Sequence, residues 1–559
     1  MRRGLNMYLS AHFLQSVRGC VFNFQLTKIL PFIILLLGFE FVQDVQAELV
    51  PCDKVDAGTV NAPGGCIAKR LDEQIGNGHG DKNTAGSAVY LVKRDPARSI
   101  RRGRQLFQRK FSTDEGLGPR VNASSTGDIT QNRALGAGLT DSCAACHGRP
   151  RGSAGFGGDV NTRPDSRDAP HLFGLGIVEQ LAEEMTQRLR NRRARALEVA
   201  EQQNRCITTP LRAKRVSFGM ITACPNGKID TSEVKGVDED LRIRPFFHQG
   251  GTVSIREFII GAFKDEMGLQ AWDPVLCAVT DPENPQAVVS PSGFAYDPAQ
   301  DTFERPAVCD ASDDTDNDGV VSEIDPALID HMEFYLLNYF KPGQYQVTQQ
   351  AERGRNLLKE IGCTSCHKPN LRINSDRRVA DVETVYDPER GIFNQLFATA
   401  TELFTLEDDG NEYPLLLPKG EPFIVKNFYS DLKRHDLGPA FHERDFDGSV
   451  VTEFVTEPLW GVGSTAPYGH DGRSINLDAV IKRHGGEAAE SRDAYLNLSV
   501  RGQRRILAFL ETLVLFPPDD TASNLNAGNV NDLETIQSPD THGSINLGAL
   551  FQIDGEGAE

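Results

Sequence analysis

Cys143-Ala144-Ala145-Cys146-His147 and Cys363-Thr364-Ser365-Cys366-His367 are two copies of one short pattern, some 220 residues apart. In each copy two cysteines are separated by two residues, and a histidine follows directly. This spacing allows both thiols to form thioethers with one haem while the histidine binds its iron. A zinc or dithiol site is the alternative, but neither copy has the second C-x-x-C nearby that a zinc site would use. The pattern therefore predicts two covalently bound haem c groups.

The first 47 residues have the composition of a secretory signal. Basic residues precede an apolar run, Ile29–Phe39, and Val45-Gln46-Ala47 provides a small-residue cleavage site, with Met7 as a second possible start. A membrane anchor is the alternative, although about eleven apolar residues are too few to cross a bilayer. We therefore expect a soluble protein that is periplasmic or secreted after signal cleavage and has no stable membrane anchor.

Charge and cysteine content limit the partners and the compartment. The 559 residues carry a formal net charge of −19. This charge argues against nucleic acid and anionic membranes as partners, and it is compatible with a basic electron donor. The six cysteines that lie outside the signal and the two motifs are Cys52, Cys66, Cys206, Cys224, Cys277 and Cys309. In an oxidising compartment they predict three disulfides, and pairing neighbours along the chain is the simplest of fifteen connectivities.

The pattern of apolar residues predicts a mainly α fold with much loop. Helices are expected over residues 101–111, 178–203, 349–360 and 500–515. Glycine-rich residues 148–158 should form a loop around a haem, residues 273–312 read as an insertion or long loop, and residues 370–425 look irregular. The expected organisation is a signal peptide (1–47), a loop-rich lead (48–100), an N-terminal haem domain with an insertion (101–345), a C-terminal cytochrome c-like haem domain (346–518) and a polar tail (519–559).

The insertion contains a candidate calcium loop. Asp314, Asp316 and Asp318 match positions one, three and five of an EF-hand loop, and Gly319 matches the sharp turn. Val320 would contribute its carbonyl, and Asp325 takes the position that usually carries glutamate. A degenerate second loop spans residues 226–233. The alternative for both loops is an acidic turn that binds no metal.

Four stretches of the sequence resemble a known family. Leu459–Gly463, Ala466–Arg473 and His484–Glu487, together with Cys146–Pro150, are similar to the di-haem oxidoreductase family, sometimes labelled thiol oxidoreductase. That family is related to the bacterial di-haem cytochrome c peroxidases. The resemblance covers most of residues 100–516. It implies two cytochrome c-like haem domains, and the calcium-loop-containing insertion lies within the first of them.

The resemblance also implies ligands for the C-terminal haem. In the peroxidases a methionine ligand lies fourteen residues after the histidine of a PY-x-HDG motif, and fourteen residues after His470 this chain has His484. His367 and His484 would then be the two axial ligands, and bis-histidine ligation lacks the positive potential that methionine gives. A helix-capping role is the alternative for His484. His435 and His470 would be hydrogen-bonding histidines near this haem.

For the N-terminal haem the resemblance implies an open, catalytic iron. No histidine occurs between His147 and His171, the interval in which the peroxidases place a removable ligand. Phe247–Gly251 and Glu266–Gly268 resemble the peroxidase segments that line the peroxide pocket. By that match Glu266 replaces the distal acid, Phe258 falls near the distal polar residue, and His248 replaces the tryptophan between the haems. An ordinary surface carboxylate is the alternative for Glu266.

These features together predict a peroxidase-like di-haem oxidoreductase. Electrons from a small cytochrome or cupredoxin-like donor would enter at the C-terminal haem and pass to the N-terminal haem, where peroxide or another small oxidant is reduced. One alternative is a dioxygenase similar to the latex-cleaving rubber oxygenases, which share the di-haem plan. The other is an electron-transfer cytochrome without catalysis, in which both irons have six ligands.

Overall fold

The computed structural model describes residues 50–51, 66–67, 75–109, 111, 142–147, 168–313, 321, 323–339, 347–386, 396–444 and 448–514. The chain forms two compact units, Met1–Ile67 and Ala68–Glu559. In the first unit the described residues are the parallel strands β1 (Val50–Pro51) and β2 (Cys66–Ile67). All other described elements belong to the second unit. None of the helices in the described residues is long and apolar enough to cross a bilayer.

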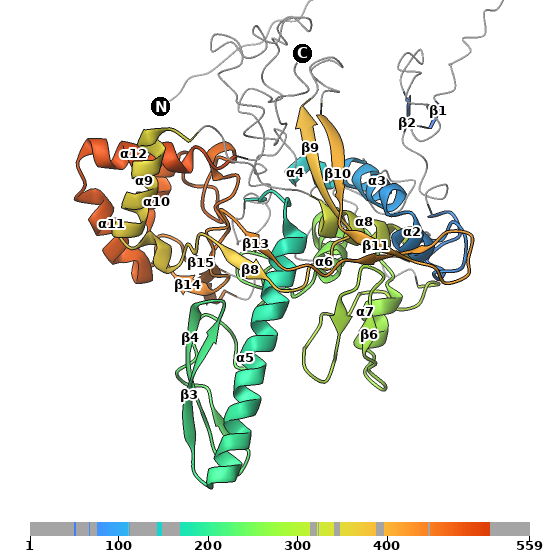
Figure 1. Cartoon of the computed structure of the whole chain (residues 1–559), viewed down its shortest axis with the longest axis horizontal. Coiled ribbons are helices and arrows are strands. Elements are labelled where there is room, and N and C mark those ends of the chain that lie inside the picture. The colour runs from blue at the N-terminus through green and yellow to red at the C-terminus, as the bar shows by residue number, and fades with distance from the viewer. Residues whose placement is uncertain are drawn as a thin grey trace, which may run out of the picture. The chain divides into compact units, whose positions relative to one another are not determined.

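The second unit combines helices with short strand pairs and loops (Figure 1). The helices are α2 (Ala88–Arg94), α3 (Pro96–Gln108), α4 (Cys143–His147), α5 (Leu175–Gln203), α6 (Ile255–Met267), α7 (Pro274–Val279), α8 (Pro326–Asn338), α9 (Gln349–Glu360), α10 (Leu477–Arg483), α11 (Ala489–Leu496) and α12 (Val500–Leu510). The strands are β3 (Ile207–Ala213), β4 (Val216–Ala223), β5 (Ile229–Asp230), β6 (Val288–Val289), β7 (Ala295–Tyr296), β8 (Leu371–Ile373), β9 (Ala380–Tyr386), β10 (Leu396–Glu402), β11 (Phe404–Glu407), β12 (Leu415–Pro418), β13 (Phe423–Val425), β14 (Arg434–Asp436), β15 (Glu443–Arg444), β16 (Val450–Val451) and β17 (Glu453–Val455).

The four expected helices are present as α3, α5, α9 and α12. Helix α9 has the predicted bounds, because Thr348 caps its first turn by accepting a hydrogen bond from the Ala351 amide. Helix α12 begins at the predicted Val500 and ends at Leu510, earlier than the periodicity suggests. Leu513 and Val514, which follow the helix, are buried all the same. The spacing of apolar residues therefore indicated which side chains are buried, although the helix itself ends earlier.

The prediction of irregular backbone over residues 370–425 is wrong. This segment holds β8 to β13, which pair antiparallel as β13 with β8, β10 with β9 and β11 with β12. Residues 273–312 are also more ordered than a loop. Asp273 caps α7, β6 and β7 pair, and Phe294 and Tyr296 are buried beside them. Local patterns this short do not separate a strand from a loop, and packing against the rest of the chain decides the outcome.

Helix α5 and the strands after it form an arm (Figure 1). Ile177, Leu181, Met185 and Leu189 make the predicted apolar stripe of α5, and all four are buried. Strands β3 and β4 then pair antiparallel and pack against α5. A disulfide between Cys206 and Cys224 ties the end of α5 to β4 and confirms the predicted pairing. We define the arm as residues 187–230.

A second disulfide, Cys277–Cys309, confirms another predicted pairing. It joins α7 to a segment 32 residues later in the sequence, before α8. For the third predicted pair, Cys66 lies in β2, whereas Cys52 lies outside the described residues.

The calcium loop falls largely outside the described residues, which exclude 314–320 and therefore Asp314, Asp316, Asp318 and Val320. Asp325 is described, and its carboxylate caps α8 by accepting a hydrogen bond of 2.8 Å from the Ala327 amide. The degenerate loop is a tight turn in which Asn226 accepts from the Lys228 amide and Asp230 accepts from the Ser232 amide. These side chains serve the turn itself, as Asx turns do.

The apolar interior consists of two clusters. The larger runs from Val92 to Trp460 in sequence and includes residues of β8 and β13 packed near α5. The smaller one lies around α9 and α12, and its buried members are Ala351, Leu358, Tyr429, Leu477, Tyr495, Ile506, Phe509, Leu510 and Leu513. Helices α9 and α12 cross closely at Gly354, where an added Cβ would lie 1.8 Å from the Arg505 carbonyl oxygen. Only glycine permits this approach.

A cluster of buried charges joins α6 to α8. The guanidinium of Arg256, fully buried, donates to Asp273, Asp330 and Glu333, whose side chains are at most 2% exposed. His79 adds a hydrogen bond of 2.6 Å from its Nδ1 to Asp330. Because unpaired charges are very costly inside a protein, such a network is stable only when every member keeps its partners. The network therefore holds α6, α8 and the segment before α2 in fixed positions relative to one another.

Candidate haem sites

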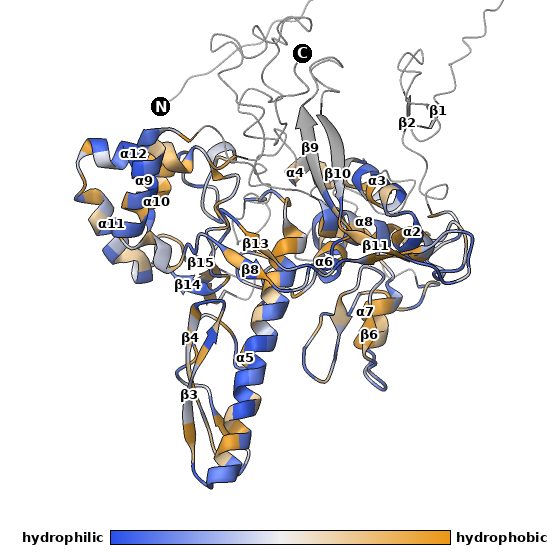
Figure 2. Ribbon diagram, viewed as in Figure 1, coloured by the Kyte–Doolittle hydropathy of each residue, from blue (hydrophilic) through white to orange (hydrophobic). Residues whose placement is uncertain are grey.

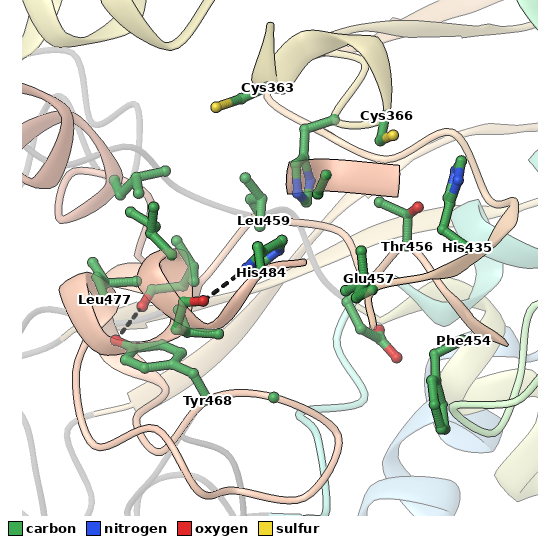
Figure 3. Close-up of a pocket in the computed structure, with 18 of the residues that line it drawn as sticks. Cys363, Cys366, His435, Phe454, Thr456, Glu457, Leu459, Tyr468, Leu477 and His484 are labelled. Carbon is green, nitrogen blue, oxygen red and sulfur yellow. Dashed lines mark hydrogen bonds between the residues drawn. The ribbon is translucent and has the colours of Figure 1, made fainter. Parts of the chain in front are cut away.

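The C-terminal motif opens onto a cavity of about 290 Å³. Its wall is predominantly apolar and includes Leu358, Ile361, Leu459, Val462, Leu477, Val480, Ile481, Ile506 and Leu510. Cys363, Cys366, His367 and His484 also line it. Figure 3 shows His484 across the pocket from Cys363 and Cys366. The cavity therefore combines an apolar wall with the groups that a c-type haem requires.

His367 is oriented by its neighbour in the fold. Its Nδ1 lies 2.9 Å from the backbone carbonyl oxygen of Tyr429, so Nδ1 carries the proton and donates it. Burial lowers the pKa of His367, which keeps the ring neutral. The lone pair is thereby left on Nε2, the atom that binds a metal in this tautomer.

His484 has the same tautomer on the other side of the cavity. Its Nδ1 donates to the Val480 carbonyl oxygen over 2.7 Å, and burial lowers its pKa to about 4. His484 is also the C-cap of α10, where its amide donates to the Ile481 carbonyl. The capping role and the ligand role are therefore compatible, because one uses the backbone and the other uses Nε2.

The residues of this cavity fit a haem. Cys363 and Cys366 are not in disulfides, and burial raises the pKa of the Cys363 thiol to about 11. Two neutral imidazoles, each with Nδ1 bound to a backbone carbonyl, line this predominantly apolar cavity. His367 and His484 would hold the iron, and the two cysteines would form the thioethers.

His435 and His470 line the same cavity, but in each of them Nε2 contacts a carboxylate. His435 contacts Asp431 through Nε2 (3.1 Å) and Glu487 through Nδ1 (2.9 Å). Burial lowers the pKa of His435, but hydrogen bonds with Asp431 and Cys366 outweigh it and raise the pKa to about 11. Both ring nitrogens of His435 are therefore occupied by carboxylates. Its place beside the attachment motif agrees with the predicted hydrogen-bonding role near this haem.

His470 is held between an aromatic ring and a carboxylate. Its ring stacks on Phe454 with centroids 3.9 Å apart, and its Nε2 lies 3.2 Å from Glu443. Burial lowers its pKa. The backbone carbonyl of His470 accepts a hydrogen bond of 2.6 Å from the Asp168 amide. His470 thus connects the cavity wall to the segment that follows the N-terminal motif.

Cys366, Asp431 and His435 could alternatively bind a metal ion, because one ligand atom from each lies within 4.8 Å of the others. The sulfur of Cys366 cannot serve both a thioether and a metal ion. The cluster is therefore an alternative to haem attachment, not an addition to it.

The N-terminal motif forms α4, and His147 at its end is anchored like His367. Nδ1 of His147 donates to the Pro170 carbonyl oxygen over 2.6 Å. Burial lowers the pKa of His147, so its Nε2 is likewise free to bind iron. Burial also raises the pKa of the Cys143 thiol to about 12. Residues 112–141 and 148–167, with the glycine-rich loop among them, lie outside the described residues.

Two of the three predicted catalytic residues, Phe258 and Glu266, lie on α6. Phe258 of α6 lies edge-on to the His147 ring at 6.5 Å between centroids, and Phe247 packs on Phe258 at 5.2 Å. Glu266 is half-buried in the last turn of α6, about 12 Å further along the helix axis than Phe258. The structure therefore brings Phe258 to His147, and the contacts it describes for His147 do not include Glu266.

Residues 168–171 connect the two sites, and we call them the linking segment. Pro170 accepts from His147, and the next residue, His171, lies 3.1 Å through Nε2 from the Trp460 carbonyl oxygen. Asp168, Pro170 and His171 also line the C-terminal cavity. His171 therefore links the residue that orients His147 to the wall of the C-terminal cavity.

His248 extends this connection. Its Nε2 lies 2.9 Å from the Asp168 carbonyl oxygen and its Nδ1 lies 3.1 Å from Glu457. Both partners are hydrogen-bond acceptors. The ring centroids of His248 and His470 are 6.0 Å apart. The family resemblance indicated His248 as a residue between the two sites. The linking segment is visible only in the structure, because no local sequence motif marks Pro170 or His171.

Comparison with known proteins agrees with the motifs. Residues 420–513 match the model of a family described as "Di-haem oxidoreductase, putative peroxidase". The match includes His435, His470 and His484, and it confirms the family resemblance found in the sequence. Together with the motifs it supports a di-haem oxidoreductase. No curated protein sequence matches the chain.

Two solved structures are similar over part of the chain. Hydrazine synthase of Kuenenia stuttgartiensis is 15% identical with a TM-score of 0.20, and the match covers 34% of this chain and 55% of that one. The chain thus spans little more than half the length of that relative. A MauG-like protein associated with microbial copper homeostasis is 14% identical with a TM-score of 0.21, and the match covers 52% of this chain and 75% of that one.

Proposed function

We propose that the protein is an exported di-haem c-type oxidoreductase of the peroxidase kind. His367 and His484 would hold a relay haem, and His147 would hold a second haem that supplies the reduction of peroxide or another small oxidant. The observation that carries the proposal is the matched pair of neutral histidines, each with Nδ1 on a backbone carbonyl and Nε2 facing one apolar cavity. When bound, the two haems supply single-electron transfer between a donor protein and the oxidant.

The chain's own residues orient and shield these groups. Hydrogen bonds from Nδ1 fix the ring orientation of His147, His367 and His484 and increase the basicity of each Nε2. The apolar wall excludes water from the C-terminal site. Bis-histidine ligation there gives a less oxidising centre than a histidine–methionine pair, which suits a relay.

The linking segment offers the route between the sites. From His147 the connection runs through one hydrogen bond to Pro170, along the backbone to His171, and through a second hydrogen bond to Trp460 in the cavity wall. His248 contacts the same segment at a second point, because its Nε2 is hydrogen-bonded to the Asp168 carbonyl oxygen. In this chain, covalent and hydrogen-bonded steps replace the tryptophan that the related peroxidases place between their haems.

Glu266, Phe258 and His248 are the proposed residues of the oxidant side. Glu266 would exchange a proton with the oxidant, as a suitably placed carboxylate can do. Phe258 keeps the surroundings of His147 apolar, and His248 holds the linking segment. A calcium ion bound by Asp314, Asp316, Asp318, Val320 and Asp325 would stabilise the entry to α8, which Asp325 already caps.

One observation favours a second candidate function. Phe246, Phe247 and Phe258 form an aromatic group next to His147, with centroid distances of 6.0 and 5.2 Å from Phe258. An apolar group of this kind suits the binding of oxygen and a hydrocarbon, as in a rubber-oxygenase-like dioxygenase. Oxygen uptake that depends on added polyisoprene would favour this function over peroxide reduction.

Electron paramagnetic resonance of the oxidised holoprotein tests the proposal, with His484→Ala beside the wild type. We expect one low-spin and one high-spin haem in the wild type, and loss of the low-spin signal in His484→Ala. His442→Ala is the matched control, because His442 contacts Asp436 and does not line the cavity. Two low-spin signals in the wild type, inert to peroxide, would instead indicate an electron-transfer cytochrome.

A further inference from the structure

Helices α9 and α12 are basic in an otherwise acidic chain. They carry six cations against two acidic residues, while the whole chain has a net charge of −19. The cations are Arg353, Arg355, Lys359, Arg501, Arg504 and Arg505, and the acidic residues are Glu352 and Glu360. Blue colouring on both helices in Figure 2 marks these hydrophilic positions.

Most of these cations are available to a partner. Arg353, Lys359, Arg501 and Arg504 are exposed, and we call these four residues the basic face. Arg355 already pairs with Glu352 at 2.8 Å, so it is not included. The two helices pack tightly, with Gly354 against the backbone of Arg505, and they therefore present their outer sides as one rigid pair.

The inner sides of the same helices form the wall of the haem cavity. Leu358 of α9 and Ile506 and Leu510 of α12 line it. Helix α9 ends at Glu360, and Cys363 follows after Ile361 and Gly362. A protein seated on the basic face is thus separated from the cavity by about one helix diameter, roughly 10–12 Å. This separation is short enough for an electron to pass through the protein from a docked donor to the cavity.

Charge alone does not single out this face, because the arm is more basic. Residues 187–230 contain ten cations and three acidic residues. None of the arm residues lines the cavity, whereas both helices of the basic face do. The arm therefore supplies a control surface of the same sign that lacks the connection to the haem site.

We propose that the basic face docks an acidic one-electron donor protein, in place of the basic donor that the overall charge suggests. This inference rests on the proposed function. In the transfer, one electron would pass from the donor's redox group to the iron that His367 and His484 would hold, with no bond formed or broken. Opposite charges on the two surfaces increase the rate of encounter and orient the donor over α9 and α12.

The test compares two triple variants with the same change of charge. Arg353→Glu/Arg501→Glu/Arg504→Glu alters the basic face, and Arg195→Glu/Arg205→Glu/Arg212→Glu alters exposed cations of the arm. Reduced flavodoxin, an acidic flavoprotein, is mixed with each oxidised holoprotein at low ionic strength, and haem reduction is followed by stopped flow. Reduced riboflavin, which is small and uncharged, reports the intrinsic reducibility of the haem. Calorimetry with oxidised flavodoxin measures binding without electron transfer.

We expect the basic-face variant to lose about tenfold or more in second-order rate and in affinity for flavodoxin, and the arm variant to lose less than about twofold. Added salt should remove the difference, since exposed charges are screened over about 10 Å at 0.1 M. Equal losses in both variants, or a larger loss in the arm variant, would overturn the proposal. Failure of reduced riboflavin to reduce the wild-type haem would instead refute the proposed function. An unchanged haem absorbance spectrum in the variants verifies their fold.

Discussion

At the scale of single residues, the decisive feature is which nitrogen of each histidine carries the proton. His147, His367 and His484 all donate through Nδ1 to a backbone carbonyl, which leaves Nε2 as the ligand atom. His435 and His248 have acceptors at both nitrogens. The structure thus separates three ligand-type histidines from two hydrogen-bonding ones, although all are the same residue type.

Replacing His484 by methionine tests its assignment as an axial ligand. We expect His484→Met to keep the C-terminal haem low-spin and to raise its potential, on the order of 0.1 V within the roughly 0.8 V over which axial ligands act. Potentiometric titration followed by absorbance measures this shift. An unchanged potential, with the His442→Met control behaving like the wild type, would show that His484 does not bind the iron.

His79 gives a prediction about pH. The hydrogen bond with Asp330 raises the pKa of His79 above its ordinary value of 6.5, although burial opposes it. The protonated ring is therefore more stable in the folded than in the unfolded protein. This contribution is complete below about pH 6.5 and is lost as the pH rises through the folded pKa.

The measurement compares urea unfolding of the wild type and His79→Gln across that range. We expect the difference in the free energy of unfolding to be largest near about pH 5.5 and to shrink toward about pH 8.5. A difference that stays constant with pH would mean that the Asp330 contact does not favour the charged ring.

At the scale of elements, helices were predictable and short strands were not. The stripe of α5 and the cap of α9 are local features, so the bounds of α9 and the buried face of α5 follow from the sequence. The pairs β8–β13 and β9–β10 have no such local signature, since each strand depends on a partner elsewhere in the chain.

The α9–α12 crossing provides a prediction at this scale. Gly354→Ala would place a methyl group 1.8 Å from the Arg505 carbonyl oxygen, so the helices must separate. We expect a loss of about 1–3 kcal/mol in the free energy of unfolding and weaker low-spin absorbance, because both helices wall the haem cavity. Asn356→Ala, at an exposed position of the same helix, is the control and should change little. Equal stability of the two variants would contradict the close crossing.

At the scale of the whole molecule, the two apolar clusters do not coincide with the two motifs. Leu371, Ile373, Val425, Phe428 and Leu432 follow the second haem motif in the chain, yet they belong to the larger cluster with residues of α5 and α6. Full burial of each such side chain contributes about 1.5–3 kcal/mol. The region around the C-terminal haem therefore depends on the rest of the second unit for part of its stability.

A fragment comparison measures this dependence. We expect residues 347–514 alone to unfold without a cooperative transition, because the side chains that join the larger cluster would be exposed. Residues 75–514 should unfold cooperatively in urea, as judged by far-ultraviolet circular dichroism. Cooperative unfolding of the shorter fragment with similar stability would show that it is an independent domain, as the boundary at residue 346 predicts.

The sequence by itself determined the two C-x-x-C-H motifs that predict haem attachment, the family resemblance near His470 and His484, and two of the disulfide pairings. Covalent attachment depends on spacing along a few residues, and such spacing is visible in a linear chain. Only the tertiary structure decided that Pro170 and His171 connect the sites, that Phe258 contacts His147, and that α9 and α12, which carry the exposed cations, also line the haem cavity. These relations join residues far apart in sequence, and they exist only because packing of the apolar clusters brings those residues together.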